Sequence, residues 1–186
     1  MKFVSAAEAV KLIKSGDSVF IQGSTSIPEV LVQAMTERAP ELRDVKVYSA
    51  FAIGRFDAPY AKAELRDSFE PLSFFVANNL RNAIKEGVAQ TIPAFLGEIP
   101  FLFRSRQVPL DVTLLNVSEP DDEGYCSYGI SADLAFSAAE CSKIIIAQVN
   151  KYMPRTFGDS VIHVSKIDAM VRGDEPLVEV PTVIPT

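Results

Sequence analysis

The run Ile144-Ile145-Ile146-Ala147 is the segment that most narrows the folds open to this chain. A strand that is apolar at every position has to be covered on both of its faces, which is typical of the interior of a parallel sheet. A strand with one solvated face would instead alternate apolar and polar residues. The run therefore predicts a parallel sheet with helices packed on both sides.

The rest of the chain alternates short apolar segments with segments of helical spacing. Ser5 and Glu8 form a capping-box pattern, which predicts a helix because apolar residues follow at helical intervals. Gly16 is expected to end this helix. The predicted strands cover residues 18–22, 45–49, 69–76, 90–95, 112–117, 125–130, 143–150 and 160–165. The predicted helices follow Ser5 and Pro28 and cover residues 59–66, 79–86, 99–104 and 132–139. Strands that alternate with helices indicate an α/β fold with an open, mainly parallel sheet.

The length and the end of the chain suggest how it is divided. A chain of 186 residues suits one domain with a sizeable core. Three prolines, at positions 176, 181 and 185, give the end of the chain the composition of an extended linker. We therefore expect one domain over residues 1–175 and a linker over residues 176–186 that leads to a further domain.

Charge and composition exclude several classes of function. The formal charge is −6 and no stripe of lysine or arginine is present, which argues against nucleic-acid binding. No apolar stretch reaches the roughly 20 residues of a membrane helix, and the first residues lack the core of a signal peptide. Two cysteines in unrelated contexts favour a reducing, cytoplasmic location. A few local cations and backbone amides would still suffice for a phosphorylated cofactor.

A polar loop follows the first predicted strand. It contains Gly23, Ser24, Thr25 and Ser26, and Pro28 then opens the next helix. Ligands of open α/β sheets bind beyond the carboxyl ends of the strands, and amides at a helix N-terminus hold phosphates, carboxylates or oxyanions. The spacing matches no established phosphate-binding motif, and many such turns bind nothing, so the loop alone leaves binding open.

A second polar loop leaves the most apolar strand at its carboxyl end. Gln148, Asn150, Met153 and Arg155 belong to it. The position favours a binding site. The alternative is a loop that satisfies its own polar groups, with Asp159 as the partner of Arg155.

Covalent catalysis and metal binding find little support. The acidic segment 119–123 is typical of a solvated turn. One histidine and two scattered cysteines do not make a zinc site, and the spacing of a calcium loop is absent. His163 lies in a strand-like segment and favours a structural role. A serine or cysteine hydrolase, with Cys126 and His163 as one pairing, stays open because sequence distance says nothing about contact.

Taken together, the segments resemble the acetyl-CoA hydrolase/transferase group of family I CoA transferases, in particular 4-hydroxybutyrate and butyrate/acetate CoA-transferases. The resemblance rests on residues 76–79, 93–95, 99–100, 119–120, 124–129, 148–150, 153–156, 158–160 and 162–164. Met-Pro-Arg-Thr at 153–156 is the most specific part, whereas residues 23–28 match only loosely.

The resemblance implies an enzyme that moves coenzyme A from an acyl-CoA to a small carboxylic acid, with CoA as substrate and product and no metal. It implies two similar α/β halves in one chain with the active site between them. A glutamate of the second half would attack the thioester, giving an anhydride and then a glutamyl-CoA thioester. That glutamate and the glycine-rich CoA loop lie beyond this chain, so we expect no catalytic residue in it and no turnover by it alone.

The resemblance also indicates which residues line the cleft that binds the acyl group and the acid. They are Gly23, Ser24, Thr25, Ser26, Pro28, Asn78, Asn79, Pro93, Phe95, Gln148, Asn150, Met153 and Arg155. Two other readings stay open, a stand-alone binding or assembly module without catalysis and a fragment of an acetyl-CoA hydrolase. The sequence leaves the acyl donor, the acceptor acid and the oligomeric state open, with a homo-oligomer as one outcome.

Overall fold

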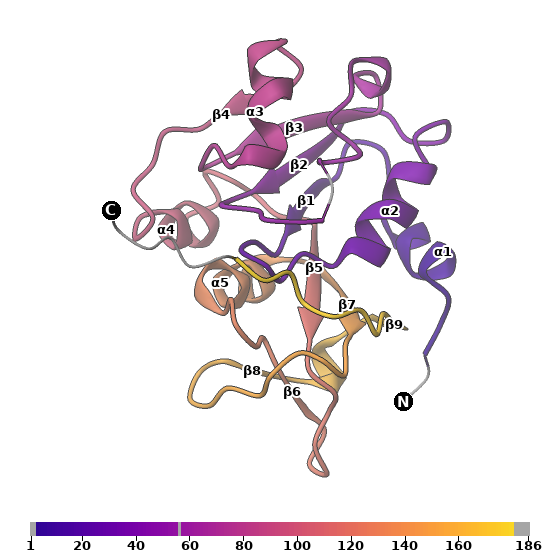
Figure 1. Ribbon diagram of the computed structural model, residues 1–186, viewed down its shortest axis with the longest axis vertical. Coiled ribbons are helices and arrows are strands. Elements are labelled where there is room, and N and C mark those ends of the chain that lie inside the picture. Colours follow the sequence, from indigo (N-terminus) through magenta and orange to yellow (C-terminus); the bar gives the residue numbers. More distant parts are fainter. Residues whose placement is uncertain (1–2, 56, 181–186) are drawn as a thin grey trace.

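The structure is a computed structural model that describes residues 3–55 and 57–180. Within these residues, seven strands form one parallel sheet in the order β4-β3-β2-β1-β5-β7-β9 (Figure 1). The strands are β1 (Ser18–Ile21), β2 (Val45–Ser49), β3 (Phe69–Ser73), β4 (Gln90–Thr91), β5 (Val112–Val117), β7 (Ile144–Val149) and β9 (Ala169–Arg172). The predicted α/β fold with an open parallel sheet is confirmed.

Helices cover both faces of this sheet. The core on one face contains residues of α1 (Ala6–Ala9), α2 (Glu29–Glu37) and α3 (Asn78–Lys85). The other face packs against α4 (Ile99–Arg104) and α5 (Asp133–Cys141). All six residues of β5 are buried, as are five of the six residues of β7. The two-sided burial is the arrangement that the apolar run 144–147 predicts.

Two predicted strands lie outside the parallel sheet. β6 (Tyr125–Ser127) and β8 (Val161–His163) pair with each other, antiparallel, with Tyr125 opposite His163. We call residues 118–129 and 153–166 the small-sheet region. It projects from the end of β5 and β7 in Figure 1.

Two further details differ from the sequence prediction. The helix expected at 59–66 is wrong: the segment forms turns and the 3-10 helix η2 (Ala63–Leu65), and Tyr60 is buried in the core. The strand expected at 90–95 is reduced to the two residues of β4. Other 3-10 segments are η1 (Val10–Leu12) and η3 (Val164–Lys166).

β9 is absent from the prediction. This strand has only four residues, between η3 and Gly173, and carries Arg172 within it. Four residues with a charge give too short an apolar pattern to recognise. Its outer edge is covered by the start of the chain, where Phe3 bridges Met170 and the Val4 amide donates to the Met170 carbonyl at 2.9 Å.

No helix within residues 3–55 and 57–180 is both long enough and apolar enough to cross a bilayer.

Candidate functional site

The strand order marks one point on the sheet as the expected position of a ligand. From β1 the chain adds β2, β3 and β4 on one side, and it then returns to place β5 on the other side of β1. Ligands of open α/β sheets bind at such a switch point, outside the carboxyl ends of the strands. We call the residues beyond the carboxyl ends of β1, β2, β3, β5 and β7 the carboxyl edge.

The loop after β1 is fixed to the loop after β2. A Cβ atom at Gly23 would lie 2.1 Å from the Ala50 carbonyl oxygen, so only glycine fits there. The Ser24 amide donates to the Phe51 carbonyl at 2.8 Å, and the Ile53 amide donates to the Ser24 carbonyl at 2.9 Å. The close approach that Gly23 allows is therefore to the protein backbone.

Gln148, at the end of β7, connects the sheet to the N-terminus of α2. Its Oε1 accepts a hydrogen bond from the Val30 amide at 3.1 Å, and its Nε2 donates to the Gly173 carbonyl at 3.3 Å. The side chain is 1% exposed. The Val30 amide is therefore already bonded to Gln148, and it is one of the amides that an anion bound at this helix N-terminus would need.

The segment after β9 lies across the carboxyl edge, and we call residues 173–180 the tail. Asn150 Nδ2 donates to the Glu175 carbonyl at 2.8 Å, and the Lys151 amide donates to the Asp174 carboxylate at 3.1 Å. Arg55 binds the Glu175 carboxylate at 2.5 Å and also donates to the carbonyl of Pro176. In Figure 1 this yellow segment crosses in front of β5 toward α5.

Beneath the tail, the switch point holds one small cavity. Its lining includes Thr25, Arg55, Asn116, Gln148 and Asn150, together with residues 175–178. The volume of about 10 Å³ is close to the space of a single water molecule. The tail therefore fills most of the space in which a ligand of the switch point would lie.

Several buried oxygens at this edge have no hydrogen-bond partner within the described part of the chain. They include Ser26 Oγ after β1, Asn116 Oδ1 near the end of β5 and Asn79 Oδ1 in the first turn of α3. Buried polar atoms in folded proteins are nearly always bonded to protein or to water. These oxygens therefore indicate bound water or a ligand at the carboxyl edge.

A larger cavity of about 520 Å³ opens beyond β2 and β3. Asn78 and Asn79 line it, as do Phe51 and Phe75. The two phenyl rings meet edge to face with centroids 5.2 Å apart, and each side chain is about half exposed. Phe51 also has a φ of 46°, which is uncommon for a bulky residue. An exposed aromatic pair beside amide side chains suits a ligand with both apolar and polar parts.

A third cavity, of about 550 Å³, lies between α2 and residues 52–60. Its lining is mainly apolar and includes Tyr60 and Asn79. The Tyr60 hydroxyl is protonated near neutral pH, as in any tyrosine, and burial raises its pKa further, to about 12, so the hydroxyl can serve as a donor.

Several of the predicted site residues, including two in one exposed loop, line none of these cavities. Pro93 and Phe95 belong to the loop between β4 and α4, and both are exposed, Phe95 to 79%. Neither lines any of the three cavities described above.

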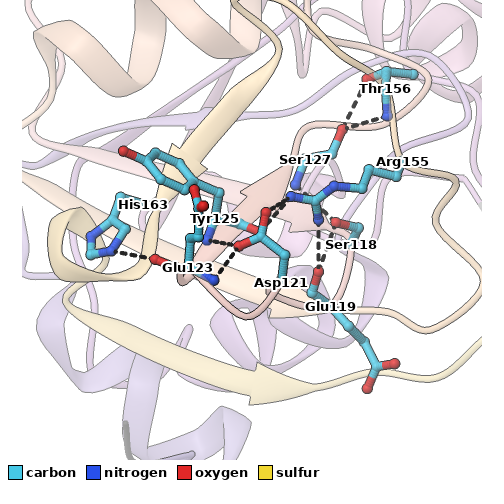
Figure 2. A network of polar contacts seen from close by, with 9 residues as sticks. All are labelled: Ser118, Glu119, Asp121, Glu123, Tyr125, Ser127, Arg155, Thr156 and His163. Carbon is cyan, nitrogen blue, oxygen red and sulfur yellow. Dashed lines mark hydrogen bonds and ion pairs between the residues drawn. The ribbon is translucent and has the colours of Figure 1, made fainter.

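Met153 and Arg155 belong to the small-sheet region. Met153 is buried against Gly129, where a Cβ atom would lie 2.0 Å from its sulfur. The guanidinium of Arg155 binds the carboxylate of Asp121 and donates to the Tyr125 carbonyl at 3.0 Å (Figure 2). The pairing with Asp159 that we considered is wrong, because the carboxylate beside Arg155 is that of Asp121.

The carboxylate of Asp121 organises the turn before β6. It accepts hydrogen bonds from the amides of Tyr125 at 2.7 Å and Glu123 at 3.1 Å. The pKa of the Asp121 carboxyl lies below its ordinary value, mainly because of the hydrogen bond from the Tyr125 amide. Desolvation opposes this shift, and the charge of Arg155 adds to it. Arg155 is thus engaged within the protein.

Hydroxyl groups complete the network of the small-sheet region (Figure 2). The Ser127 hydroxyl accepts from the amides of Gly129 and Thr156, both at 3.0 Å, and lies 2.8 Å from the Thr156 hydroxyl. The Thr156 hydroxyl also donates to the Gly129 carbonyl at 3.1 Å. Through Thr156, the Met-Pro-Arg-Thr motif therefore attaches the loop after β7 to the end of β6.

His163 contacts a serine, as the hydrolase alternative requires. Its Nδ1 accepts from the Ser165 amide at 3.2 Å and lies 2.7 Å from the Ser165 hydroxyl, while Nε2 faces the Glu123 carbonyl at 3.1 Å. The bond from the Ser165 amide to the His163 side chain caps the N-terminus of the 3-10 helix η3. In a catalytic triad a carboxylate orients the histidine, and here the second nitrogen faces a backbone carbonyl. The contact is that of a local cap.

Neither a reactive thiol nor a cluster of metal ligands is found among residues 3–55 and 57–180. Burial raises the pKa of Cys126 to about 11, so its thiol stays protonated near neutral pH and is a poor nucleophile. Among residues 3–55 and 57–180, no three His, Cys, Asp or Glu side chains gather as ligands of a metal ion.

The sequence, compared with protein families, matches the Acetyl-CoA hydrolase/transferase N-terminal domain over residues 1–182. This chain belongs to the acetyl-CoA hydrolase/transferase family.

Several curated relatives are similar to this chain over nearly all of its length. A 4-hydroxybutyrate coenzyme A transferase of Clostridium kluyveri is 39% identical over 96% of this chain and 41% of its own length. A succinyl-CoA:acetate/propanoyl-CoA:succinate CoA transferase of Fasciola hepatica is 38% identical over 91% of this chain and 35% of its own length. The chain thus spans about two fifths of the length of these relatives.

Solved structures agree with this assignment. RipA from Yersinia pestis superposes with a TM-score of 0.89 at 28% identity, over all of this chain and 45% of its own. A 4-hydroxybutyrate CoA-transferase from Porphyromonas gingivalis gives a TM-score of 0.78 at 32% identity, over 96% of this chain and 41% of its own. The fold of this family member is therefore that of CoA-transferase structures.

Two features of the carboxyl edge in this family member are absent from the sequence prediction. Arg55 lies in an irregular loop without a recognisable motif, and the path of the tail depends in part on the contact between Glu175 and Arg55, which are 120 positions apart. The composition of the tail indicates only an extended segment.

Proposed function

We propose that this chain is the N-terminal domain of a CoA-transferase that moves CoA from an acyl-CoA to a small carboxylate such as acetate or 4-hydroxybutyrate. The family match over residues 1–182, with relatives that are CoA transferases, is the observation that carries the proposal. The unpaired oxygens at the carboxyl edge support it, because they indicate a ligand or bound water at the switch point.

In the proposed reaction, a glutamate of a C-terminal half attacks the thioester carbonyl of the acyl-CoA. The thiolate of CoA leaves, and the acyl group and the glutamate form an anhydride. The thiolate then attacks the glutamyl carbonyl, which releases the first acid and gives a glutamyl-CoA thioester. The acceptor acid reverses these steps and leaves as a new acyl-CoA, so no oxidant or reductant is consumed.

This chain would supply one wall of the cleft. We propose that the loop after β1, with Thr25 and Ser26, and the polar end of β7, with Gln148 and Asn150, face the reacting groups. The cavity beside Asn78 and Asn79 would receive part of the acyl-CoA. We assign Met153 and Arg155 to the scaffold of the small-sheet region, because their contacts lie within it.

The remaining parts of the proposal concern the setting of the domain. The domain would end near residue 175, and the residues after it would lead to the C-terminal half. A second copy of the protein, in a homo-oligomer, would be a further partner. Two free cysteines favour a cytoplasmic location.

The test uses the natural protein that carries this chain. Butyryl-CoA and ¹³C-labelled acetate are incubated with it, and the expected product is ¹³C-labelled acetyl-CoA, detected by mass spectrometry. The 186-residue chain alone serves as the control and should give no labelled product. Absence of labelled acyl-CoA with every small acid tried would refute transfer.

The family includes hydrolases, so the same assay has to separate the two activities. A thiol reagent detects free CoA, which accumulates in hydrolysis and not in transfer. Release of CoA without labelled acyl-CoA would assign a hydrolase. Neither product would favour a binding or assembly module.

A further inference from the structure

Arg55 is a cation at the carboxyl edge that already holds a carboxylate. Its Nη1 lies 2.5 Å from Glu175 Oε2 and 3.7 Å from Glu29 Oε2. The Arg55 amide also donates to Glu29 Oε1 at 2.7 Å. Glu29 thus fixes the loop that carries Arg55, whereas Glu175 reaches the guanidinium from the tail. The Arg55 side chain is 31% exposed, so the guanidinium is open to exchange with solutes.

The position of Arg55 connects two spaces at the carboxyl edge. It lines the small cavity at the switch point and also the larger cavity beyond β2 and β3. The tail passes both, since residues 175–178 line the first cavity and residues 179–180 line the second. A molecule that extends from one cavity to the other would pass the guanidinium.

The side chains of this edge that contact the tail all act as hydrogen-bond donors. Arg55, Asn150 Nδ2 and Gln148 Nε2 are all donors, and each donates to an oxygen of the tail, from Gly173 to Pro176. If the tail moves away, these donors lose their acceptors together. A group of freed donors that includes a guanidinium suits a carboxylate, which accepts at both of its oxygens.

We propose that Arg55 binds the carboxylate of the acid substrate and that Glu175 occupies this position when no acid is bound. The proposal rests on the proposed function, because it identifies where that function places its acid. Guanidinium is the side-chain group best matched to a carboxylate, and Glu175 shows that the site accommodates one. Glu175 acts as an intramolecular competitor.

The competition predicts opposite effects for the two residues. Loss of the Arg55 charge removes the binding partner of the acid, so its KM should rise at least about tenfold. Loss of the Glu175 charge removes a competitor held at high effective concentration, so the KM of the acid should fall by about threefold to tenfold. The KM of the acyl-CoA should change less than the KM of the acid in both cases, because the thioester carries no carboxylate for Arg55, although Arg55 also lines the cavity proposed for part of the acyl-CoA.

The experiment compares Arg55→Gln, Arg55→Lys and Glu175→Gln in the natural protein that carries this chain, with KM measured separately for acetate and for butyryl-CoA. Arg55→Lys should lie between wild type and Arg55→Gln, because lysine keeps the charge and loses the two-pronged geometry. Arg104→Gln and Glu140→Gln provide a matched control, since these residues form an arginine–glutamate pair between α4 and α5. The control variants should keep both KM values.

A binding measurement separates this inference from the proposed function. Acetate is titrated into the natural protein that carries this chain, and binding is followed by saturation-transfer difference NMR. Glu175→Gln should bind acetate more tightly than wild type, and Arg55→Gln should not bind it, even if the natural protein transfers no CoA. Normal circular dichroism confirms that each variant is folded. Equal acetate affinities in wild type and Glu175→Gln, or an unchanged KM for acetate in Arg55→Gln, would overturn the inference.

Discussion

The carboxyl edge and the small-sheet region are both polar, yet they differ in how far they satisfy their own hydrogen bonds. Ser127 in the small-sheet region and Ser26 at the carboxyl edge are both fully buried. The Ser127 hydroxyl accepts from two backbone amides, whereas Ser26 Oγ has no partner within the described chain. A distinctive polar motif can therefore be a scaffold, and unsatisfied buried groups are the better sign of a binding position.

The largest expected effect concerns the backbone contact that holds the carboxyl edge together. In Gly23→Ala, the new Cβ atom would clash with the Ala50 carbonyl oxygen at 2.1 Å, and overpacking of this kind costs about 3 kcal/mol. Urea unfolding should show a lower midpoint with an unchanged slope. Gly97→Ala is the control, because its Cβ would meet nothing within 4 Å. Equal midpoints for the two variants would contradict the packing argument.

The next effect tests the scaffold role of the small-sheet region. Ser127→Ala leaves the amides of Gly129 and Thr156 without their acceptor, and this should cost about 1–3 kcal/mol of unfolding free energy. The natural protein should keep its KM for acid and for acyl-CoA. A changed KM without a loss of stability would assign Ser127 to the binding site and remove the contrast between the regions.

A smaller, pH-dependent effect is expected from Asp121. Its pKa in the folded chain lies below the ordinary 3.8, so its ionised form stabilises the fold above that value and the stabilisation is lost as the pH falls through the folded pKa. Asp121→Asn should therefore lower the thermal midpoint near pH 7 and have a vanishing effect in strong acid. A difference between variant and wild type that stays constant with pH would exclude the carboxylate as its cause.

The smallest effect on stability is expected at Ser26. Its hydroxyl makes no bond within the described chain, so Ser26→Ala should change the unfolding free energy by no more than about 0.5 kcal/mol or raise it. If the oxygen serves a ligand, the CoA-transfer rate of the natural protein should nevertheless fall. A large loss of stability would show that a bound water makes Ser26 part of the scaffold.

The sequence predicts those parts of the fold that depend on local pattern. The buried run of β7 and the capping box of α1 are of this kind, and the Ser5 side chain accepts from the Glu8 amide as expected. The helix expected at 59–66 fails because Tyr60 is drawn into the core, and tertiary packing overrides a weak helical pattern.

The candidate site is less predictable because it depends on contacts between distant segments. The position of Gln148 at the end of a central strand follows from its sequence neighbours, whereas its bond to the Val30 amide joins residues 118 positions apart. Arg155 looks available in the sequence and is held by Asp121 in the structure. Arg55 and Glu175 meet across 120 positions, and no local pattern reports such a pair.

The two margins of the parallel sheet have a consequence for how copies of this chain would associate. β4 is only two residues long, and the outer side of β9 is bridged by Phe3. Short or covered margins offer few free backbone groups to a neighbouring molecule. A second copy is therefore expected to dock through side chains, without extending the hydrogen-bonded ladder from one subunit into the next.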